Sequence, residues 1–321
     1  MNDKERDRCS DGAGPAAPDD GGPHRRQSLL AIYIFLLLSI ALTGKIVAQE
    51  GSGLSLTIDA GMLRANDVHA NFYNGSEDNT NTIYRVIHSQ AYGEEIWRNL
   101  KNPELTPNTI TDAVANYNQL TVVEYGNMHY KLAFNLDIGI RYEYNGGWAW
   151  LLRVDYSKLN AVGAFNISRD NSTGIVSGTR YVTCDIAGQE SRIACDLGLS
   201  KRFYLHNRSY ISIESGGRFN NTKVLSNDIR IAGNTYSILD VWGGENPSAY
   251  TVPYEYINQG GLGYGAFATL SYGIAIPGTA SVAVAYTLSC EKINLQGYTS
   301  FALQHLFGLR FDLTGMVFFN D

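Results

Sequence analysis

The sequence is poor in the residues and segments that mark many familiar classes of protein. Its 321 residues include only 8 prolines and 4 cysteines. No two cysteines have the CxxC spacing of a metal or redox site, so we predict no metal and no cofactor. The net charge of -6 excludes the basic surface that nucleic acid requires. The one pronounced apolar run, residues 29–44, is shorter than the roughly 20 residues of a membrane-spanning helix.

That apolar run predicts an export signal. It follows Arg25 and Arg26, and small or β-branched residues then lead to a cleavage point at Ala48. We therefore divide the chain into a signal peptide with a long n-region, residues 1–48, and a mature domain, residues 49–321. A retained inner-membrane anchor is the alternative. No cysteine follows the run, which argues against a lipoprotein.

What the sequence does have is alternation. In Tyr130–Tyr144 every second residue is large and apolar, and the residues between them are small, polar or charged. Side chains alternate between the two faces of a β-strand, so this segment predicts one strand with an apolar face and a polar, charged face. A mean hydropathy of -0.17 is compatible with this, because alternation hides apolar strands from a hydropathy window.

Seven further segments show the same alternation, and their connections alternate between short and long. Tight turns are predicted at residues 145–147, 206–208 and 277–278, and looser connections at residues 65–127, 169–190, 221–256 and 292–300. Eight strands fit the count, and ten remain open if the long connections contain hairpins. The predicted strands are residues 53–64, 130–144, 148–162, 191–205, 209–220, 260–276, 279–291 and 301–314.

The export signal, the eight alternating segments and the short–long rhythm resemble the small outer-membrane β-barrel proteins of the OmpA-like class. Gln49, after the cleavage point, resembles exported proteins of Bacteroidetes. The resemblance implies an all-β fold: an eight-stranded antiparallel up-and-down transmembrane barrel with long extracellular loops, located in the bacterial outer membrane. It also implies insertion by the barrel assembly machinery, although the chain ends Asn320-Asp321 after Phe318-Phe319 rather than on an aromatic residue.

If the apolar residues of each strand face lipid, the polar residues between them line the inside of the barrel. We expect it to form a salt-bridged plug, because eight strands enclose only enough space for side chains. A narrow or gated pore is the alternative, to be tested by neutralising Arg141 or Arg153. The predicted interior polar network is Asp59, Lys131, Asp137, Arg141, Glu143, Arg153, Asp155, Asp196, Arg202, Glu214, Arg218, Arg310 and Asp312.

Aromatic residues beside the tight turns predict a girdle at headgroup level. Its members are Tyr142, Tyr144, Trp148, Trp150, Tyr204 and Tyr210. Cys184 and Cys195, eleven residues apart, could pair as a disulfide in an oxidising compartment.

The 65–127 segment is too long for a structureless connection, and residues 80–101 have near-helical apolar spacing. We predict a partly helical loop, split at Gly93, that either caps the barrel or offers Tyr92 and Trp97 to a partner. His88, His129 and His305 form no Ser-His-acid constellation that can be located by sequence, so no catalytic residue is predicted.

We therefore expect a non-enzymatic outer-membrane barrel with a structural or surface-interaction role, adhesion or binding, through its long outward loops. A narrow pore for small solutes is the first alternative, and a lipid-acting enzyme, with an outward His305, is the second. A soluble lipocalin-type barrel is disfavoured because it needs an apolar interior. The expected partners are outer-membrane lipid and lipopolysaccharide, the assembly machinery, and a surface protein or host ligand.

Overall fold

The computed structural model describes residues 53–79, 81–89, 92–101, 120–169, 180–205, 208–239, 259–276 and 280–314. The predicted signal peptide, Cys9 and the C-terminal residues 315–321 lie outside these ranges. No helix in the described part of the chain combines the length and the apolar character needed to cross a membrane.

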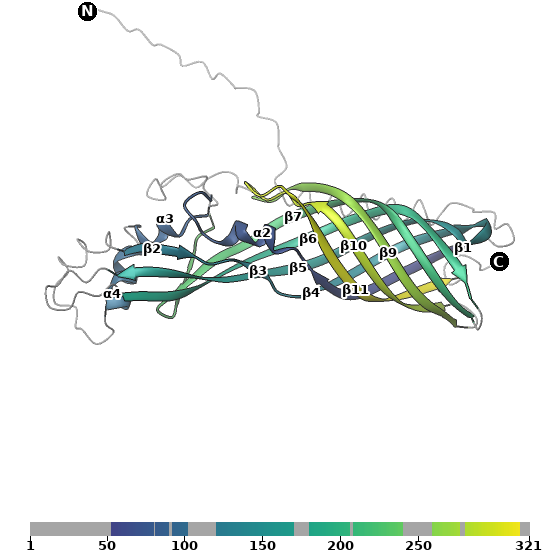
Figure 1. Cartoon of the computed structure of the whole chain (residues 1–321), viewed down its shortest axis with the longest axis horizontal. Coiled ribbons are helices and arrows are strands. Elements are labelled where there is room, and N and C mark those ends of the chain that lie inside the picture. The colour runs from purple at the N-terminus through teal and green to yellow at the C-terminus, as the bar shows by residue number, and fades with distance from the viewer. Residues whose placement is uncertain are drawn as a thin grey trace, which may run out of the picture. The chain divides into compact units, whose positions relative to one another are not determined.

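Eight antiparallel strands pair around a closed ring, seen in Figure 1 as the crossed ribbons. The first strand of the chain pairs on one side with the last strand and on the other with the next ring strand, which closes the circle. A closed sheet has no free edge, so the backbone groups of the ring bond within it. The ring strands are β1 (Gly53–Arg64), β4 (Ala133–Tyr144), β5 (Trp148–Arg169), β6 (Arg180–Tyr204), β7 (Ser209–Ile231), β9 (Leu262–Ile276), β10 (Ala280–Lys292) and β11 (Phe301–Thr314).

Short connections join β4 to β5, β6 to β7 and β9 to β10, all at the same end of the ring, as predicted. The first is a 3₁₀ turn, Asn145–Gly147, in which Gly146 and Gly147 both have φ of 79°. This left-handed conformation is strained for any residue with a Cβ, so the Asn-Gly-Gly sequence suits the turn. The strands β1 and β11 also have the predicted bounds.

Strands β5, β6 and β7 are much longer than predicted, with 22, 25 and 23 residues. Much of the predicted loops 169–190 and 221–256 therefore consists of strand, because the β5–β6 pairing continues to Arg169 and Arg180. β8 (Asn234–Ser237) then turns back to pair with β7. We call the residues 159–169 of β5, 180–190 of β6 and 224–231 of β7, together with β8 and the described residues between 65 and 130, the extension. The prediction failed here because the first outward residues past the ring, including Lys158, Asn160 and Ser191, are polar and interrupt the apolar alternation.

The described residues of the 65–127 segment form part of the extension and include helices, as predicted. They hold α2 (Asp67–Ala70), a 3₁₀ turn (Asn71–Tyr73), α3 (Ile83–Ile87) and α4 (Gly93–Lys101). Gly93 begins α4, so the predicted split at this glycine is confirmed. The sequence did not predict β2 (Leu120–Tyr125), which pairs with β5 and adds a strand to the extension.

The extension has a hydrophobic core of its own. Fully buried side chains from its helices and turns, including Phe72, Ile83 and Ile96, join buried side chains of the long strands, including Phe165 and Ile229. Burial of apolar surface contributes about 25 cal/mol per Å², so this core stabilises the packing of these segments against the strands. The extension is therefore built as a packed sheet with helices and not as a set of free loops.

The predicted strand over Tyr130–Tyr144 is interrupted. Residues His129–Tyr130 form a separate short strand, β3, which pairs with β5. Lys131 and Leu132 intervene before β4, and both are exposed. Two consecutive outward residues reverse the phase, as a β-bulge does, so Tyr130 points inward and is 8% exposed. The expectation that Tyr130 shares the apolar face, and that Lys131 faces the interior, was wrong.

Candidate functional site

The interior of the ring holds the charged side chains that the sequence placed there, with one exception. Twelve of the thirteen predicted interior residues line the lumen or its rim, and the exception is the exposed Lys131. Each strand points every second side chain inward, so the register of the ring brings these charges to defined neighbours.

Arg153 is the centre of this network. Its guanidinium lies 3.0 Å from Asp196, 3.2 Å from Glu214, 3.6 Å from Asp137 and 3.8 Å from Asp59. The partners come from β1, β4, β6 and β7, so one side chain from β5 links five of the eight ring strands. A guanidinium suits this position because it offers five N–H donors in a plane.

Two further arginines extend the network. Arg310 of β11 donates through Nε and Nη2 to Asp59 at 2.8–2.9 Å and through Nη1 to Glu214. Arg218 of β7 donates to Asp196 at 2.6 Å and to Asp155 at 2.8 Å. With Arg153, they connect opposite walls of the ring through nearly buried ion pairs.

A second group lies at the end of the ring with the tight turns. Arg141 donates to Glu143, and Arg202 donates to Asp312. Tyr210, assigned above to the aromatic girdle, belongs to this interior group instead. It is 2% exposed, and its hydroxyl donates to Asp312 at 3.2 Å. Its even number puts it in phase with the inward Ser212 and Glu214.

The other predicted girdle residues also fall into two groups, one on the outside of the ring and one at the lumen. Tyr144, Trp148 and Trp150 are exposed on the outside of the ring beside the first turn, as predicted. Tyr142 is partly buried in the same phase. Tyr204 is exposed but follows the inward phase of β6, and its hydroxyl donates to Glu143 at 2.7 Å. Tyr204 therefore lies at the rim of the lumen and is not part of the girdle.

The structure adds a third group, which the sequence did not predict, at the mouth where the ring meets the extension. Glu190 accepts hydrogen bonds from the Tyr73 hydroxyl at 2.6 Å and the Tyr130 hydroxyl at 3.1 Å. Arg192 donates to Glu190 at 2.6 Å and to Gln304 at 2.8 Å. The predicted strand began at residue 191, so Glu190 fell in a presumed loop. Continuing the two-residue period backwards from Arg192 would have found it.

The segment Asp67–Tyr73 covers this mouth. His69 lies 2.9 Å through Nε2 from the Ser300 carbonyl, and burial lowers the pKa of its imidazole. Burial and the neighbouring Glu190 carboxylate raise the pKa of Tyr73 well above its ordinary value. A Cβ at Gly188 would stand 2.1 Å from the Tyr73 ring, so this glycine makes room for the tyrosine. Both groups are therefore neutral near pH 7, as a tightly packed cover requires.

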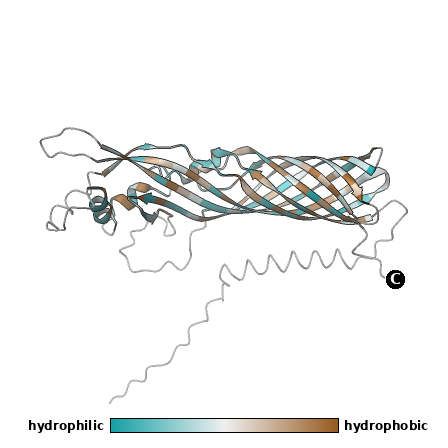
Figure 2. Ribbon diagram, turned by 90° about the horizontal axis from the view of Figure 1, so that it is seen from below, coloured by the Kyte–Doolittle hydropathy of each residue, from teal (hydrophilic) through white to brown (hydrophobic). Residues whose placement is uncertain are grey.

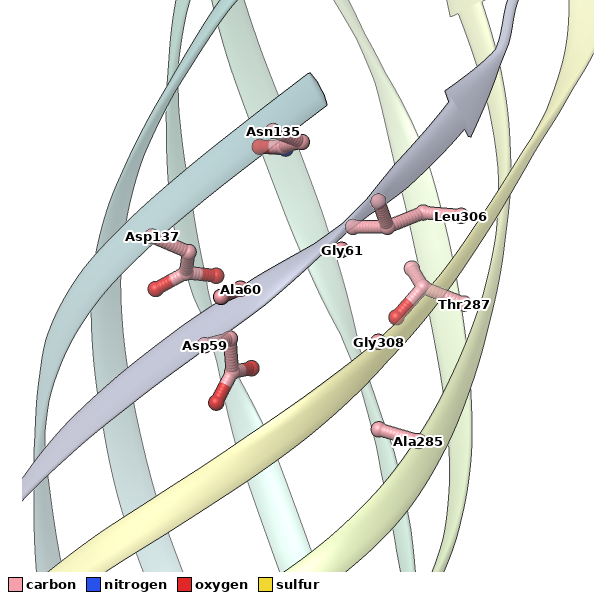
Figure 3. A pocket seen from close by; sticks show the side chains of 9 residues that line it. All are labelled: Asp59, Ala60, Gly61, Asn135, Asp137, Ala285, Thr287, Leu306 and Gly308. Carbon is pink, nitrogen blue, oxygen red and sulfur yellow. The ribbon is translucent and has the colours of Figure 1, made fainter. Parts of the chain in front are cut away.

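Little space remains in the lumen near the central network. A cavity of about 10 Å³ lies against Asp59, Asn135 and Asp137, which is room for about one water molecule (Figure 3). Asp59 pairs in register with Asp137, and Asp137 pairs with Asp155, so three carboxylates stand side by side on adjacent strands. Within the described residues, no group of His, Cys, Asp or Glu is arranged to hold a metal ion.

The cysteine prediction was wrong. Cys184 and Cys195 both lie on β6 and are free thiols. Eleven residues along one strand separate them by about 36 Å, far more than a disulfide spans. Their odd separation also puts them on opposite faces: Cys184 is buried in the core of the extension, where burial raises the pKa of its thiol to about 11.

The predicted histidines lie apart. His88 follows α3 and stacks on Tyr84, with ring centroids 4.0 Å apart. His129 is exposed on β3. His305 has the outward phase of β11 that was predicted, and its Nδ1 lies 2.8 Å from the Tyr286 hydroxyl.

The outer surface of the ring is apolar, and this apolar belt ends abruptly on the side of the extension. Trp150, Leu152 and Tyr156 on β5 are exposed, Val154 between them is partly exposed, and the next outward residue is Lys158. The register pairs Tyr156 with Ile193 of β6, and the next two outward residues of β6 on this side, Ser191 and Gln189, are polar. Figure 2 shows apolar and polar residues alternating along the strands of the ring. Apolar side chains thus face outward and charged ones inward, the reverse of a soluble protein.

No family model matches the sequence, and no curated protein matches it. Several solved structures resemble the fold. Neisserial surface protein A is 8% identical, with a TM-score of 0.37, and the match covers 82% of this chain and 98% of that one. The outer membrane protein OprG of Pseudomonas aeruginosa is 8% identical, with a TM-score of 0.34, over 82% and 96%. Ail, the attachment invasion locus protein of Yersinia pestis, is 8% identical, with a TM-score of 0.29, over 83% and 99%. At these TM-scores and identities the likenesses assign neither a family nor a function.

The chemical character of the ring's outer and inner surfaces indicates the location of the protein. A closed antiparallel sheet satisfies its backbone without water, and an apolar outside with a charged inside is the arrangement of outer-membrane barrels. The protein is a β-barrel of the bacterial outer membrane. A soluble barrel of the lipocalin type is excluded by the charged lumen and the apolar exterior.

Proposed function

We propose that this protein is an eight-stranded transmembrane barrel with a closed lumen that presents its extension outside the cell as a surface-interaction module. The observation that carries the proposal is the continuation of β5, β6 and β7 past the apolar belt into a second hydrophobic core. In outer-membrane barrels the short turns face the periplasm, which puts the extension outside. The up-and-down order and the antiparallel pairing resemble the OmpA-like class.

The extension is suited to contact with another molecule because it is ordered and its outer face carries solvent-exposed polar side chains. Its outward side chains on β6 include Thr183 and Asp185, both exposed. Thr183 donates to Asn166 at 2.8 Å, and Asn166 donates to Glu124 at 2.8 Å, so a row of polar side chains runs across three strands. A preorganised polar surface loses little entropy on binding, which favours adhesion or binding to a surface protein or host ligand.

The lumen supports a structural role for the barrel better than a transport role. Passage of a solute past Arg153 would require it to leave four carboxylates, and unpaired buried charges are costly. We therefore propose a non-enzymatic anchor, assembled by the barrel assembly machinery in contact with outer-membrane lipid and lipopolysaccharide.

Cysteine labelling on intact cells tests the orientation. In a background with Cys195→Ser and Cys290→Ser, which removes the accessible native thiols, Thr183→Cys places a thiol on the extension and Arg208→Cys places one at the tight-turn end, where residue 208 is exposed. A membrane-impermeant maleimide should label residue 183 on intact cells and residue 208 only after lysis. Labelling of residue 208 alone on intact cells would reverse the orientation and contradict the proposal.

Attachment to coated surfaces tests the role. Cells that produce the full chain should attach to immobilised fibronectin or laminin more than cells that produce a variant lacking residues 164–186. The shortened variant should still migrate differently on detergent gels before and after heating, because the ring is untouched. Equal attachment of the two strains would refute a binding role of the extension towards these matrix proteins.

A further inference from the structure

A row of basic residues follows the edge of the apolar belt on one side of the barrel. It consists of Arg64 at the end of β1, Lys131 between β3 and β4, Lys158 on β5 and Lys223 on β7. All four side chains are exposed. We call these four residues the basic row.

The strand register places these residues next to one another. Lys158 pairs with Ser191 of β6, and Ser191 pairs with Lys223. The backbone N–H of Lys131 donates to the carbonyl of Asn160, two residues beyond Lys158. Since strands lie about 4.8 Å apart, the row from β1 to β7 spans four spacings, or about 19 Å of the circumference.

Arg64 completes the row on its other side. Leu63 pairs with Ala133, two residues after Lys131, so Arg64 lies beside the bulge. Arg64 also pairs in register with His305, whose side chain faces outward on β11. The bulge that displaced Tyr130 into the lumen is thus also what turns Lys131 outward into this row.

The level of the row is that of a lipid headgroup. Lys158 is two residues beyond Tyr156, and Lys223 is four beyond Phe219, both exposed on the apolar belt. At about 3.3 Å per residue, the charges begin roughly 7 Å past the last apolar side chains. Long basic side chains at this depth extend their heads to the polar interface while their stems cover apolar surface.

No acidic group in the described part of the chain forms an ion pair with the row. On the ring strands, up to and including the row, every described Asp and Glu belongs to the inward phase. Asp67 lies nearby on α2, and its carboxylate accepts a hydrogen bond from the backbone N–H of Tyr130 at 2.8 Å. The result is an outward strip of positive charge next to lipid.

We propose that the basic row binds the phosphate groups of outer-leaflet lipid, such as those of lipopolysaccharide. The inference rests on the proposed orientation, which puts the row at the outer leaflet. Ammonium and guanidinium groups form charge-assisted hydrogen bonds with phosphate oxygens, and the four heads are spaced to meet more than one phosphate. The lipid would hold the barrel at a fixed depth and cover the seam where the extension leaves the membrane.

The opposite end of the barrel provides a matched control. Lys201 of β6 also has the outward phase, but its ammonium lies 5.1 Å from the centroid of the Trp148 ring and donates to the Gly146 carbonyl. It is thus engaged by the protein at the tight-turn end. Lys201→Gln removes one outward charge without touching the basic row.

The experiment compares the wild type, Lys158→Gln/Lys223→Gln and Lys201→Gln in detergent micelles. Each is titrated with lipid A bearing two phosphates, with the dephosphorylated lipid, and with inorganic phosphate, and bound lipid is counted by native mass spectrometry. Each basic group near an anionic surface contributes about fivefold in affinity, so the double variant should bind roughly 25-fold more weakly. Lys201→Gln should bind like the wild type, and the dephosphorylated lipid should bind all three equally.

Three results would overturn the proposal. These are equal affinity of the double variant and the wild type, equal binding of phosphorylated and dephosphorylated lipid, and displacement of the lipid by millimolar inorganic phosphate, which would make the row a site for the free ion. All proteins are first shown to be folded by heat-modifiable migration. A wild type that fails this step contradicts the barrel itself, whereas a folded wild type without lipid preference contradicts only the basic row.

Discussion

Removing Arg310 from the lumen is the sharpest test of the idea that the ring is held together from inside. Arg310→Gln deletes the paired hydrogen bonds to Asp59 and the bond to Glu214. Arg310, Asp59 and Glu214 are all buried. Without the arginine, the two carboxylates stay removed from water but lose a positively charged partner. We expect the free energy of unfolding to fall by about 3–5 kcal/mol.

A double-mutant cycle separates the ion pair from its surroundings. In Arg310→Gln/Asp59→Asn both charges are gone, and part of the loss should be recovered, with a coupling energy of about 1–3 kcal/mol. Asp185→Asn, which removes an exposed charge on the outer side of the extension, serves as the control and should change stability by less than about 0.5 kcal/mol.

The assay is urea unfolding of the barrel in lipid vesicles, followed by the fluorescence of Trp148 and Trp150, which face outward. The slope of free energy against urea must be equal for all variants, so that only stability differs. Additivity of the two single substitutions within about 0.5 kcal/mol would refute the reasoning. It would show that Arg310 and Asp59 lie close together without stabilising each other.

Further predictions concern the lumen, the thiols and the cover of the mouth. In planar bilayers the wild type and Arg153→Gln should show no steady single-channel current; an open channel in the wild type would restore the pore alternative. At pH 8 a maleimide should leave Cys184 unmodified in the folded protein, because the thiol is buried and its pKa of about 11 leaves about 0.1% thiolate, and mass spectrometry should find no link to Cys195. Burial lowers the folded pKa of His69 below 6.5, so the unfolded segment takes up the proton first as the pH falls. The docking of α2 should therefore weaken as the pH falls below 6.5, which is measured as a loss of amide-exchange protection, relative to the intrinsic rate at each pH, over residues 67–73; constant protection, or the same loss in His69→Gln, would contradict this.

The ring strands were predictable because each carries its own evidence. Alternation in β1 and β11 gave bounds that the structure repeats, and Asn145-Gly146-Gly147 specified its turn through backbone conformation alone. Both properties are local: the two-residue period of a strand and the positive φ of glycine depend on near neighbours only.

The sequence predicted most of the polar residues inside the ring but not which of them contact one another. The inward phase selected twelve of the interior residues, but Glu190 was missed because the apolar phase of β6 ends before it. Tyr130 and Lys131 were misplaced because a bulge shifts the phase by one residue, and its signal lies in the pairing with β5.

The sequence by itself determined which side chains share a face of each uninterrupted strand, because successive residues of a strand point to opposite faces. Only the tertiary structure decided which charges meet, where the apolar belt ends, and that the presumed loops are long strands with a core of their own. These properties depend on register between strands far apart in the chain, such as Asp59 against Arg310, and a one-residue slip in any pair would change them all.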